Sequence, residues 1–184
     1  GIRPIAFRHE RGAVMAADGF SRVSDRERFG VVAVQSQAGA ENALGGLAQA
    51  YADNVPILML PGGINLDRLG VRPNFSASAN YGGVVKRVEA MYTPDQVVTV
   101  MRRAFHALRS GTSGPVVVEL TGDVCANETA GLLEHYQPPR RVRQVPTRSD
   151  VKDAVAALLR AKRPVLWAGA GVLRSRGTQA LKEL

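Results

Sequence analysis

The first 125 residues alternate between short apolar runs and Ala/Gly-rich segments with helical spacing. Three runs come first, separated by two such segments, and they lie at residues 5–7, 30–35 and 56–60. This strand–helix–strand–helix–strand order is typical of a parallel α/β sheet. A later run at residues 115–120 and an amphipathic segment at residues 93–110 extend the pattern. We therefore predict an α/β fold, with a parallel sheet flanked by helices.

The helix predicted at residues 93–110 has clear signals at its start and along one face. Thr93 suits the N-cap and Pro94 suits the first helical position, where its missing N–H costs no hydrogen bond. The apolar residues recur at the spacing of one helix face, at Val97, Val100, Met101, Ala104, Phe105 and Leu108. His106 lies beside this stripe. Because no Cys or His is within helical reach, we interpret it as a surface residue rather than a metal ligand.

A polar triplet, Arg8-His9-Glu10, follows the first predicted strand, and the next helix is predicted to begin at Glu10. A carboxylate at the C-terminal end of a strand lies where open α/β sheets hold their ligands. A glutamate in the first turn also stabilises a helix by interacting with its dipole. The local pattern alone favours this structural role over a catalytic one.

Several segments resemble, in order and at similar separations, the pyrimidine-binding domain of thiamine-diphosphate-dependent enzymes of the acetolactate synthase and pyruvate decarboxylase type. These segments are RHERGAVMAADGFSR, QSQAGAEN, ALGGLAQAYADNVP, ILMLPGG and SGPVVVELTGDV, and they cover most of residues 5–125. In this family, the glutamate after the histidine contacts the aminopyrimidine ring of the cofactor. The resemblance therefore implies that Glu10 is a catalytic and cofactor-binding residue.

The turn after the second predicted strand, residues 36–42, reads SQAGAEN where many family members have SGPGATN. The resemblance implies that Gly39, Ala40 and Asn42 bind the cofactor, and backbone N–H groups at a helix start suit polar ligand atoms. The chain departs from the family at Gln37, where glycine is usual. Two roles stay open for Gln37: a contact to the substrate, or a turn residue that faces solvent.

The resemblance implies an enzyme that makes or breaks a carbon–carbon bond beside the carbonyl of a 2-oxo acid, by acetolactate-synthase-like synthesis or by decarboxylation. A protonated Glu10 would hydrogen-bond a ring nitrogen of thiamine diphosphate, while the cofactor supplies the electron sink. Such a carboxyl group needs a pKa raised by burial, and we expect Val14 and Met15 in the next turn to provide it. Lys86 lies near a position where the family often has a basic residue; a solvent-facing lysine is the other interpretation.

The formal net charge of +8 invites a nucleic-acid interpretation, but the charge distribution argues against it. Residues 1–125 carry 13 basic and 11 acidic side chains, and residues 126–184 carry 11 and 5. Much of this excess lies in a proline-containing stretch without interleaved aromatic residues, at Arg140, Arg141, Arg143 and Arg148. We therefore predict that nucleic acid is not a partner.

Two further observations bear on the surroundings of the protein. No apolar run approaches the roughly 20 residues that span a bilayer, so we predict that a membrane is not a partner. The single cysteine, Cys125, excludes an internal disulfide and offers no thiolate cluster for a metal. Both observations favour a cytoplasmic location, and we predict no metal site on this chain.

Composition divides the chain into three parts. Residues 1–125 are the predicted pyrimidine-binding α/β domain; the resemblance implies that an earlier strand and helix precede it, so we expect a fragment that lacks its first elements. Residues 126–149 are polar, contain three prolines and form a predicted connector. Residues 150–184 are expected to be the truncated start of a Rossmann-like central domain, with a helix capped by Ser149 and a strand at residues 164–168.

The resemblance also bears on the other cofactors. The strand predicted at residues 164–168 leads into Gly169-Ala170-Gly171, but Arg174 replaces the third glycine of a dinucleotide fingerprint. The central domain binds FAD in some family members and no nucleotide in others, so both alternatives stay open. The family binds the diphosphate and its Mg²⁺ through a Gly-Asp-Gly…Asn motif in a C-terminal domain, and this sequence lacks that motif. The chain alone is therefore expected to bind the cofactor weakly and to be inactive.

The complete site in these enzymes lies between two subunits, which implies a homo-oligomer, either a dimer or a tetramer. The helix after Glu10 is rich in small residues, which suit a subunit interface or close packing on its own sheet. Two other classes of function stay open: a catalytically silent α/β domain with a binding or regulatory role, and a dinucleotide-binding domain that uses residues 169–171. The sequence identifies neither the 2-oxo acid nor the reaction among synthase, decarboxylase and lyase.

Overall fold

The computed structural model describes residues 2–25, 27–128, 131, 133–134, 136–140 and 144–184. The chain forms two compact units, residues 1–142 and residues 143–184. The division into functional domains at residues 125 and 149 stays a prediction.

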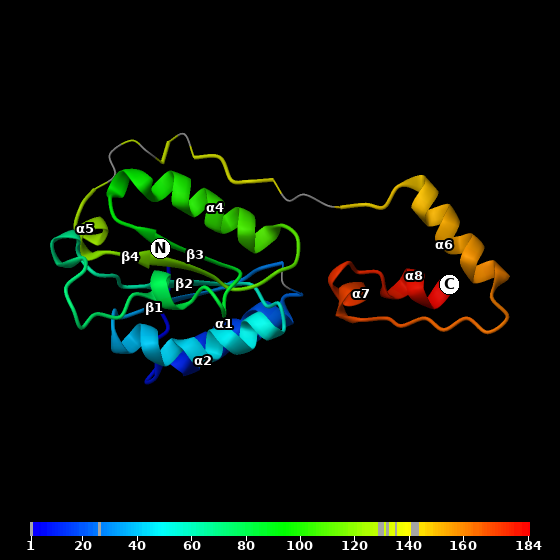
Figure 1. Ribbon diagram of the computed structural model, residues 1–184, viewed down its shortest axis with the longest axis horizontal. Helices are drawn as coiled ribbons and strands as arrows, with labels where there is room; N and C mark the ends of the chain where they lie inside the picture. The colour runs from blue at the N-terminus through cyan, green and yellow to red at the C-terminus, as the bar shows by residue number, and fades with distance from the viewer. Residues whose placement is uncertain (1, 26, 129–130, 132, 135, 141–143) are drawn as a thin grey trace. The chain divides into compact units, whose positions relative to one another are not determined.

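Four parallel strands form the sheet of the first unit, in the spatial order β1-β2-β4-β3. They are β1 (Gly30–Val34), β2 (Ile57–Pro61), β3 (Arg87–Met91) and β4 (Val116–Leu120). One face of the sheet carries the helices α1 (Glu10–Val23) and α2 (Ala38–Ala52), and the other carries α4 (Val97–Arg109), as Figure 1 shows. This arrangement confirms the predicted α/β fold with a parallel sheet flanked by helices.

The helix α4 begins where the sequence predicts a helix start. A single turn of 3-10 helix, η2 (Pro94–Gln96), precedes it. The side-chain oxygen of Gln96 accepts hydrogen bonds from the N–H groups of Tyr92 and Thr93, at 2.8 and 3.3 Å. The predicted apolar stripe faces the sheet; its members pack with β2 and β4 in one apolar cluster, and Val100, Ala104 and Leu108 are buried.

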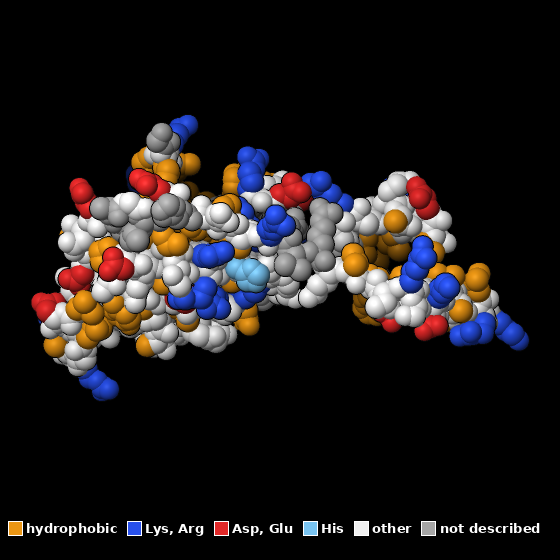
Figure 2. All heavy atoms as spheres, turned by 90° about the horizontal axis from the view of Figure 1, so that it is seen from above, with side chains coloured by type: hydrophobic (Ala, Val, Ile, Leu, Met, Phe, Trp, Pro, Cys, Tyr) orange, Lys and Arg blue, Asp and Glu red, His pale blue; other side chains and the backbone are white. Residues whose placement is uncertain are grey.

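The outer face of α4 is basic. Figure 2 looks down on this side of the molecule and shows Lys and Arg side chains gathered there with a histidine. The exposed residues of α4 include Arg102, Arg103, His106 and Arg109. Arg103 Nε donates to Glu89 Oε2 at 2.7 Å, which joins the helix to β3. His106 is a surface residue, as predicted.

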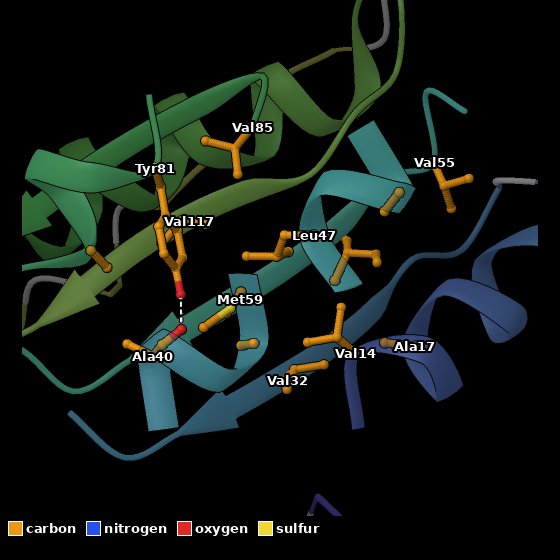
Figure 3. Packing of buried hydrophobic residues seen from close by; sticks show 14 residues of the cluster. Val14, Ala17, Val32, Ala40, Leu47, Val55, Met59, Tyr81, Val85 and Val117 are labelled. Atoms are coloured by element: carbon orange, nitrogen blue, oxygen red, sulfur yellow. Dashed lines mark hydrogen bonds between the residues drawn. The ribbon is translucent and has the colours of Figure 1, made fainter. Parts of the chain in front are cut away.

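Alternate residues of the central strands enter two separate apolar cores. In β2, Ile57 and Met59 pack against α1 and α2, whereas Leu58 between them packs against α4. In β4, Val117 belongs to the first core, which Figure 3 shows, and Val116 belongs to the second. Successive strand residues point to opposite faces, so a strand covered on both faces needs a nearly continuous apolar run. Such runs are what the sequence has at β2 and β4.

The helix α1 approaches both the sheet and α2 closely. A Cβ atom on Gly30 would lie 2.5 Å from Cα of Ala17, and one on Gly46 would lie 2.9 Å from Cγ1 of Val14. Only glycine permits these two approaches, because real Cβ atoms do not come so near. The small residues of α1 therefore serve packing within the unit, and a subunit interface on this helix stays a prediction.

One strand expected in the first unit does not form. Residues 5–7 do not form a strand, and Ile5 and Phe7 are 72% and 49% exposed. The run is short, and no layer of apolar side chains from the described residues covers it. The run that forms β1 is almost wholly apolar but is not covered on both faces, because Val31 is 57% exposed. The strand β1 lies at the edge of the sheet, and α4 packs mainly against β3 and β4.

The segment from residue 64 to residue 83 is mostly irregular. It contains only short turns of helix, η1 (Leu66–Arg68) and α3 (Ala77–Asn80). A short helix, α5 (Gly122–Cys125), follows β4. The long segment therefore depends on side-chain contacts for its position.

The strand β3 begins at Arg87 rather than at Val84, where the apolar run starts. Lys86, just before it, is partly buried and does not face solvent. Its Nζ donates to the backbone carbonyls of Ala107 and Ser110, at 2.5 and 2.6 Å. These carbonyls lie at the C-terminal end of α4, where a helix leaves its last acceptors unpaired.

The second unit holds the helices α6 (Arg148–Arg160), α7 (Ala170–Arg174) and α8 (Thr178–Glu183). Thr147 caps α6, rather than the predicted Ser149: its Oγ1 accepts a hydrogen bond from the N–H of Asp150 at 3.2 Å. The strand predicted at residues 164–168 does not form, and Trp167 is 96% exposed.

A strand is stable only within a ladder, and the described part of this unit offers no second strand. The expectation that the unit begins a Rossmann-like domain stays a prediction. Arg141 and Arg143 of the predicted connector lie outside the described residues.

Candidate functional site

Glu10 is the first residue of α1, as predicted, and its side chain is partly exposed. The preceding residue, His9, caps the helix, because its Nδ1 accepts a hydrogen bond from the N–H of Arg11 at 3.1 Å. An acidic residue in the first turn interacts favourably with the helix dipole. The position of Glu10 alone therefore agrees with a structural role.

The neighbours of Glu10 come from the start of α2. Asn42 Nδ2 donates to Glu10 Oε2 at 3.2 Å. A Cβ atom on Gly39 would lie 3.5 Å from Glu10 Oε1, so the absence of a side chain there leaves room beside the carboxylate. The fold thus brings together three of the predicted site residues, although Glu10 and Asn42 are 32 positions apart in the chain.

The pKa of Glu10 is lowered from its usual value, contrary to the expected rise. A backbone hydrogen bond at Glu10 is the largest cause, and the Asn42 amide and the nearby His9 add to it. The apolar cover expected from the next turn is missing: Val14 is wholly buried in the core, and Met15 is 41% exposed. In this chain Glu10 is therefore an ionised carboxylate at neutral pH.

Ala40 is buried, with its methyl group in the apolar core beneath α2. Its backbone carbonyl accepts a hydrogen bond from the hydroxyl of Tyr81, as Figure 3 shows. Burial raises the pKa of Tyr81, and the charges of Glu119 and Glu41 add to the rise, so the phenol stays protonated and donates. Ala40 therefore ties the first turn of α2 to the 64–83 segment, and its contact with a cofactor stays a prediction.

Gln37 is not a turn residue that simply faces solvent, because its side chain is partly buried and hydrogen-bonded, and its contact with a substrate stays a prediction. Its Nε2 donates to Asn74 Oδ1 at 3.0 Å, and its Oε1 accepts from the N–H of Phe75 at 2.9 Å. Both atoms of the amide are therefore engaged by the 64–83 segment. The backbone of Gln37 has φ +59° and ψ −119°, a conformation that glycine adopts far more readily than other residues. This explains why glycine suits the position in the resembled family.

The sequence analysis missed Glu119, a buried carboxylate in β4 that is 4% exposed. Its Oε2 accepts from Ser76 Oγ at 3.0 Å and from the N–H of Ser78 at 2.9 Å, and its Oε1 accepts from the N–H of Ala77 at 3.0 Å. A charged residue inside the apolar run VVVEL was the available signal, because a buried carboxylate needs hydrogen-bond donors.

Two kinds of site are absent from the described part of the chain. Across those residues, no group of three or more His, Cys, Asp and Glu side chains could hold a metal ion. None of the described helices is both long enough and apolar enough to cross a membrane.

Comparison with known proteins shows which class of protein this chain resembles. Residues 1–90 match the family model described as thiamine pyrophosphate enzyme, N-terminal TPP binding domain, where TPP is thiamine pyrophosphate, another name for thiamine diphosphate. The matched residues, which are similar to that domain family, include Glu10, Gly39 and Asn42. The match confirms the resemblance that the sequence segments indicate.

Individual relatives match nearly the whole chain. The acetolactate synthase large subunit of Buchnera aphidicola subsp. Acyrthosiphon pisum (strain APS) is 32% identical over 193 residues, covering 99% of this chain and 33% of the relative. The acetolactate synthase isozyme 3 large subunit of Escherichia coli (strain K12) is 33% identical over 190 residues, covering 100% of this chain and 33% of the relative. Glyoxylate carboligase of Escherichia coli O157:H7 is 32% identical over 187 residues, covering 100% and 31%. The chain thus spans about a third of the length of these relatives.

Proposed function

We propose that this chain supplies the N-terminal, pyrimidine-binding part of a thiamine-diphosphate-dependent enzyme that acts on a 2-oxo acid, by carbon–carbon bond formation or by decarboxylation. The observation that carries the proposal is the cluster of Glu10, Gly39 and Asn42, which lies within the residues that match the family. The names of the relatives support the bond-forming alternative, as acetolactate synthases and a carboligase.

The residues present fit the aminopyrimidine part of the cofactor. Gly39 leaves open the space beside Glu10 Oε1, which any side chain would occupy. The carboxylate is partly exposed at the start of a helix, so a flat polar ring can reach it without displacing core residues. Glu10, Gly39 and Asn42 would hold this ring, with the backbone of Ala40 behind them.

Glu10 would hold a proton at a ring nitrogen of the aminopyrimidine. When bound, thiamine diphosphate supplies the electron sink for the carbanion that forms beside the former carbonyl. The lowered pKa of Glu10 in this chain means that the proton is absent before assembly. Exclusion of water by the cofactor and by a second subunit would raise that pKa, because a dry site disfavours the charged carboxylate.

The remaining parts of the proposed enzyme lie outside this chain. Mg²⁺ and the diphosphate would be held by a further domain carrying the Gly-Asp-Gly…Asn motif, which is missing from these 184 residues. A second subunit would complete the site, in a homodimer or a homotetramer, and FAD in a central domain stays an open alternative. We also keep the prediction of a cytoplasmic enzyme.

The test is a carboxyl-to-amide substitution, Glu10→Gln, in the full-length enzyme that carries this chain. We expect consumption of pyruvate that depends on added thiamine diphosphate, and a loss of about 10²- to 10⁴-fold in the variant, the usual contribution of a positioned acid or base. Glu41→Gln is the matched control, because Glu41 is an exposed carboxylate in the first turn of α2, and it should keep the wild-type rate.

Unchanged activity of Glu10→Gln would contradict the catalytic role and favour a structural glutamate. Absence of any cofactor-dependent activity in the wild-type enzyme, with intact folding, would favour the alternative of a catalytically silent binding or regulatory domain.

A further inference from the structure

Five consecutive residues of the 64–83 segment are held from two sides. On one side, the amide of Gln37, which precedes α2, binds the side chain of Asn74 and the backbone N–H of Phe75. On the other side, the buried carboxylate of Glu119 binds residues 76–78 through two backbone N–H groups and one hydroxyl. Residues 74–78 are thus fixed by side chains from two different elements, although they contain only the start of one short helix.

The two anchors differ in what they support. The residues that Glu119 holds continue into α3, where Ala77 is buried in the core, so this anchor secures the folded unit. Gln37 instead holds the partly buried residues Asn74 and Phe75 beside the turn that leads to Gly39. Because Gly39 lies against Glu10, Gln37 links these two residues to the turn that borders the candidate site.

The backbone conformation of Gln37 also indicates that the side chain is the reason why glutamine occupies this position. At φ +59° the residue is in a region where glycine carries no steric penalty and glutamine does. Glycine in this turn would relieve the penalty but would remove both hydrogen bonds to the segment. The side-chain amide is therefore the part of Gln37 that compensates its strained backbone.

We propose that Gln37 is a positioning residue, which fixes Asn74 and Phe75 as an immobile wall beside the Glu10 site. The aromatic ring of Phe75, packed edge-on against Tyr81 with 6.1 Å between ring centres, is the apolar part of this wall. This inference rests on the proposed function for its consequence: the wall limits the space for the 2-oxo acid. Gln37 acts on the site through the segment, because its amide nitrogen binds Asn74 and its amide oxygen binds Phe75.

Amide hydrogen exchange in the 184-residue chain tests the anchor directly, with no cofactor present. In Gln37→Gly, we expect the N–H of Phe75 to exchange at least about tenfold faster, the loss in protection that follows when one hydrogen bond of ordinary strength is removed. The N–H groups of Ala77 and Ser78 should keep their rates, because Glu119 still accepts from them. Glycine suits the backbone at this position, so the variant should fold.

Asn54→Gly is the matched control, because Asn54 also has a positive φ, +54°, but lies at the end of α2 that leads into β2. It should leave the exchange of Phe75 unchanged. An unchanged rate at Phe75 in Gln37→Gly would overturn the proposal. So would an equal increase at Phe75, Ala77 and Ser78, which indicates general loosening rather than the loss of one anchor.

Kinetics of the full-length enzyme test the consequence at the site. Gln37→Gly should raise KM for the 2-oxo acid at least about tenfold while kcat changes less, because the wall positions substrate and Glu10 keeps its own contacts. An unchanged KM would overturn the positioning role. If the wild-type enzyme shows no thiamine-diphosphate-dependent activity, the proposed function fails, whereas the exchange result still decides whether Gln37 anchors the segment.

Discussion

Glu10 and Asn42 meet at the starts of two helices that the chain order keeps far apart. Their hydrogen bond of 3.2 Å stabilises the carboxylate and is one cause of the lowered pKa of Glu10. A carboxyl group that we propose to hold a proton in the assembled enzyme is thus kept ionised in this chain. Asn42 adds to the backbone hydrogen bond that is the largest cause of the lowered pKa.

The substitution Asn42→Ala tests this relation within the 184-residue chain. We expect the pKa of Glu10, measured by NMR titration of its carboxyl carbon, to move up towards the usual value of 4.5. The substitution Gln49→Ala deletes an exposed amide on the same helix, and it should leave the titration of Glu10 unchanged. An equal midpoint in wild type and Asn42→Ala would contradict the role of Asn42.

The lowered pKa also predicts how stability depends on pH. Because the folded value lies below the unfolded value of 4.5, Glu10 contributes stability above pH 4.5 and loses that contribution as the pH falls through the folded pKa. The difference in unfolding free energy between wild type and Glu10→Gln, measured with urea, should be constant near neutral pH and shrink in acid. A difference that grows in acid would mean that the pKa of Glu10 is raised on folding.

The sequence predicted the position of Glu10 but not its electrostatics. A helix start after His9 is a local property, and the order of the family segments singled out Glu10, Gly39 and Asn42. The burial of Val14 and the exposure of Met15 depend on how α1 turns against the sheet, which spacing alone did not settle. Gln37 and Glu119 act on residues about 40 positions away, so their partners could be identified only in the fold.

At the scale of elements, Lys86 joins the start of β3 to the end of α4. Its ammonium group donates to two carbonyls that the helix leaves without an intrahelical partner. Burial lowers the pKa of Lys86, but these two acceptors compensate part of the cost of burying the charge. Lys86 is therefore a helix cap rather than a solvent-facing lysine, and its match to a position where the family often has a basic residue stays a prediction.

Replacing this lysine with methionine keeps the apolar stem and removes the donors. We expect Lys86→Met to lower the free energy of unfolding by about 1–3 kcal/mol, the cost of leaving partly buried carbonyls without a partner. The control Arg102→Met, on the exposed face of α4, should change the free energy of unfolding by less than about 0.5 kcal/mol. Equal effects of both substitutions on urea unfolding would contradict the capping role.

The strands that the sequence predicted correctly have both an apolar run and a neighbouring strand with which to pair. The runs that became β2 and β4 lie between two helix layers, and each pairs with a neighbouring strand on both sides. The runs at residues 5–7 and 164–168 are equally apolar but have no ladder within the described residues. Hydrophobic pattern indicates where a strand can form, and strand pairing determines whether it does.

At the scale of the whole molecule, the chain contains one of the two cofactor-binding parts of the proposed enzyme. It has the carboxylate that we propose to contact the pyrimidine, and it lacks the sequence motif that the resembled family uses for the diphosphate and Mg²⁺. It also covers only about a third of its relatives. The chain alone should therefore consume no 2-oxo acid, even with added thiamine diphosphate and Mg²⁺.

The most direct test of the central claim follows the C2 proton of the thiazolium ring in the full-length enzyme. Its exchange with deuterium, measured by NMR after rapid quenching, reports the activation that Glu10 is proposed to support, before any substrate is involved. We expect exchange in Glu10→Gln to be slower by about 10²- to 10⁴-fold than in wild type and in the Glu41→Gln control. Equal exchange rates in all three proteins would contradict the account, because Glu10 would then be only the first acidic residue of its helix.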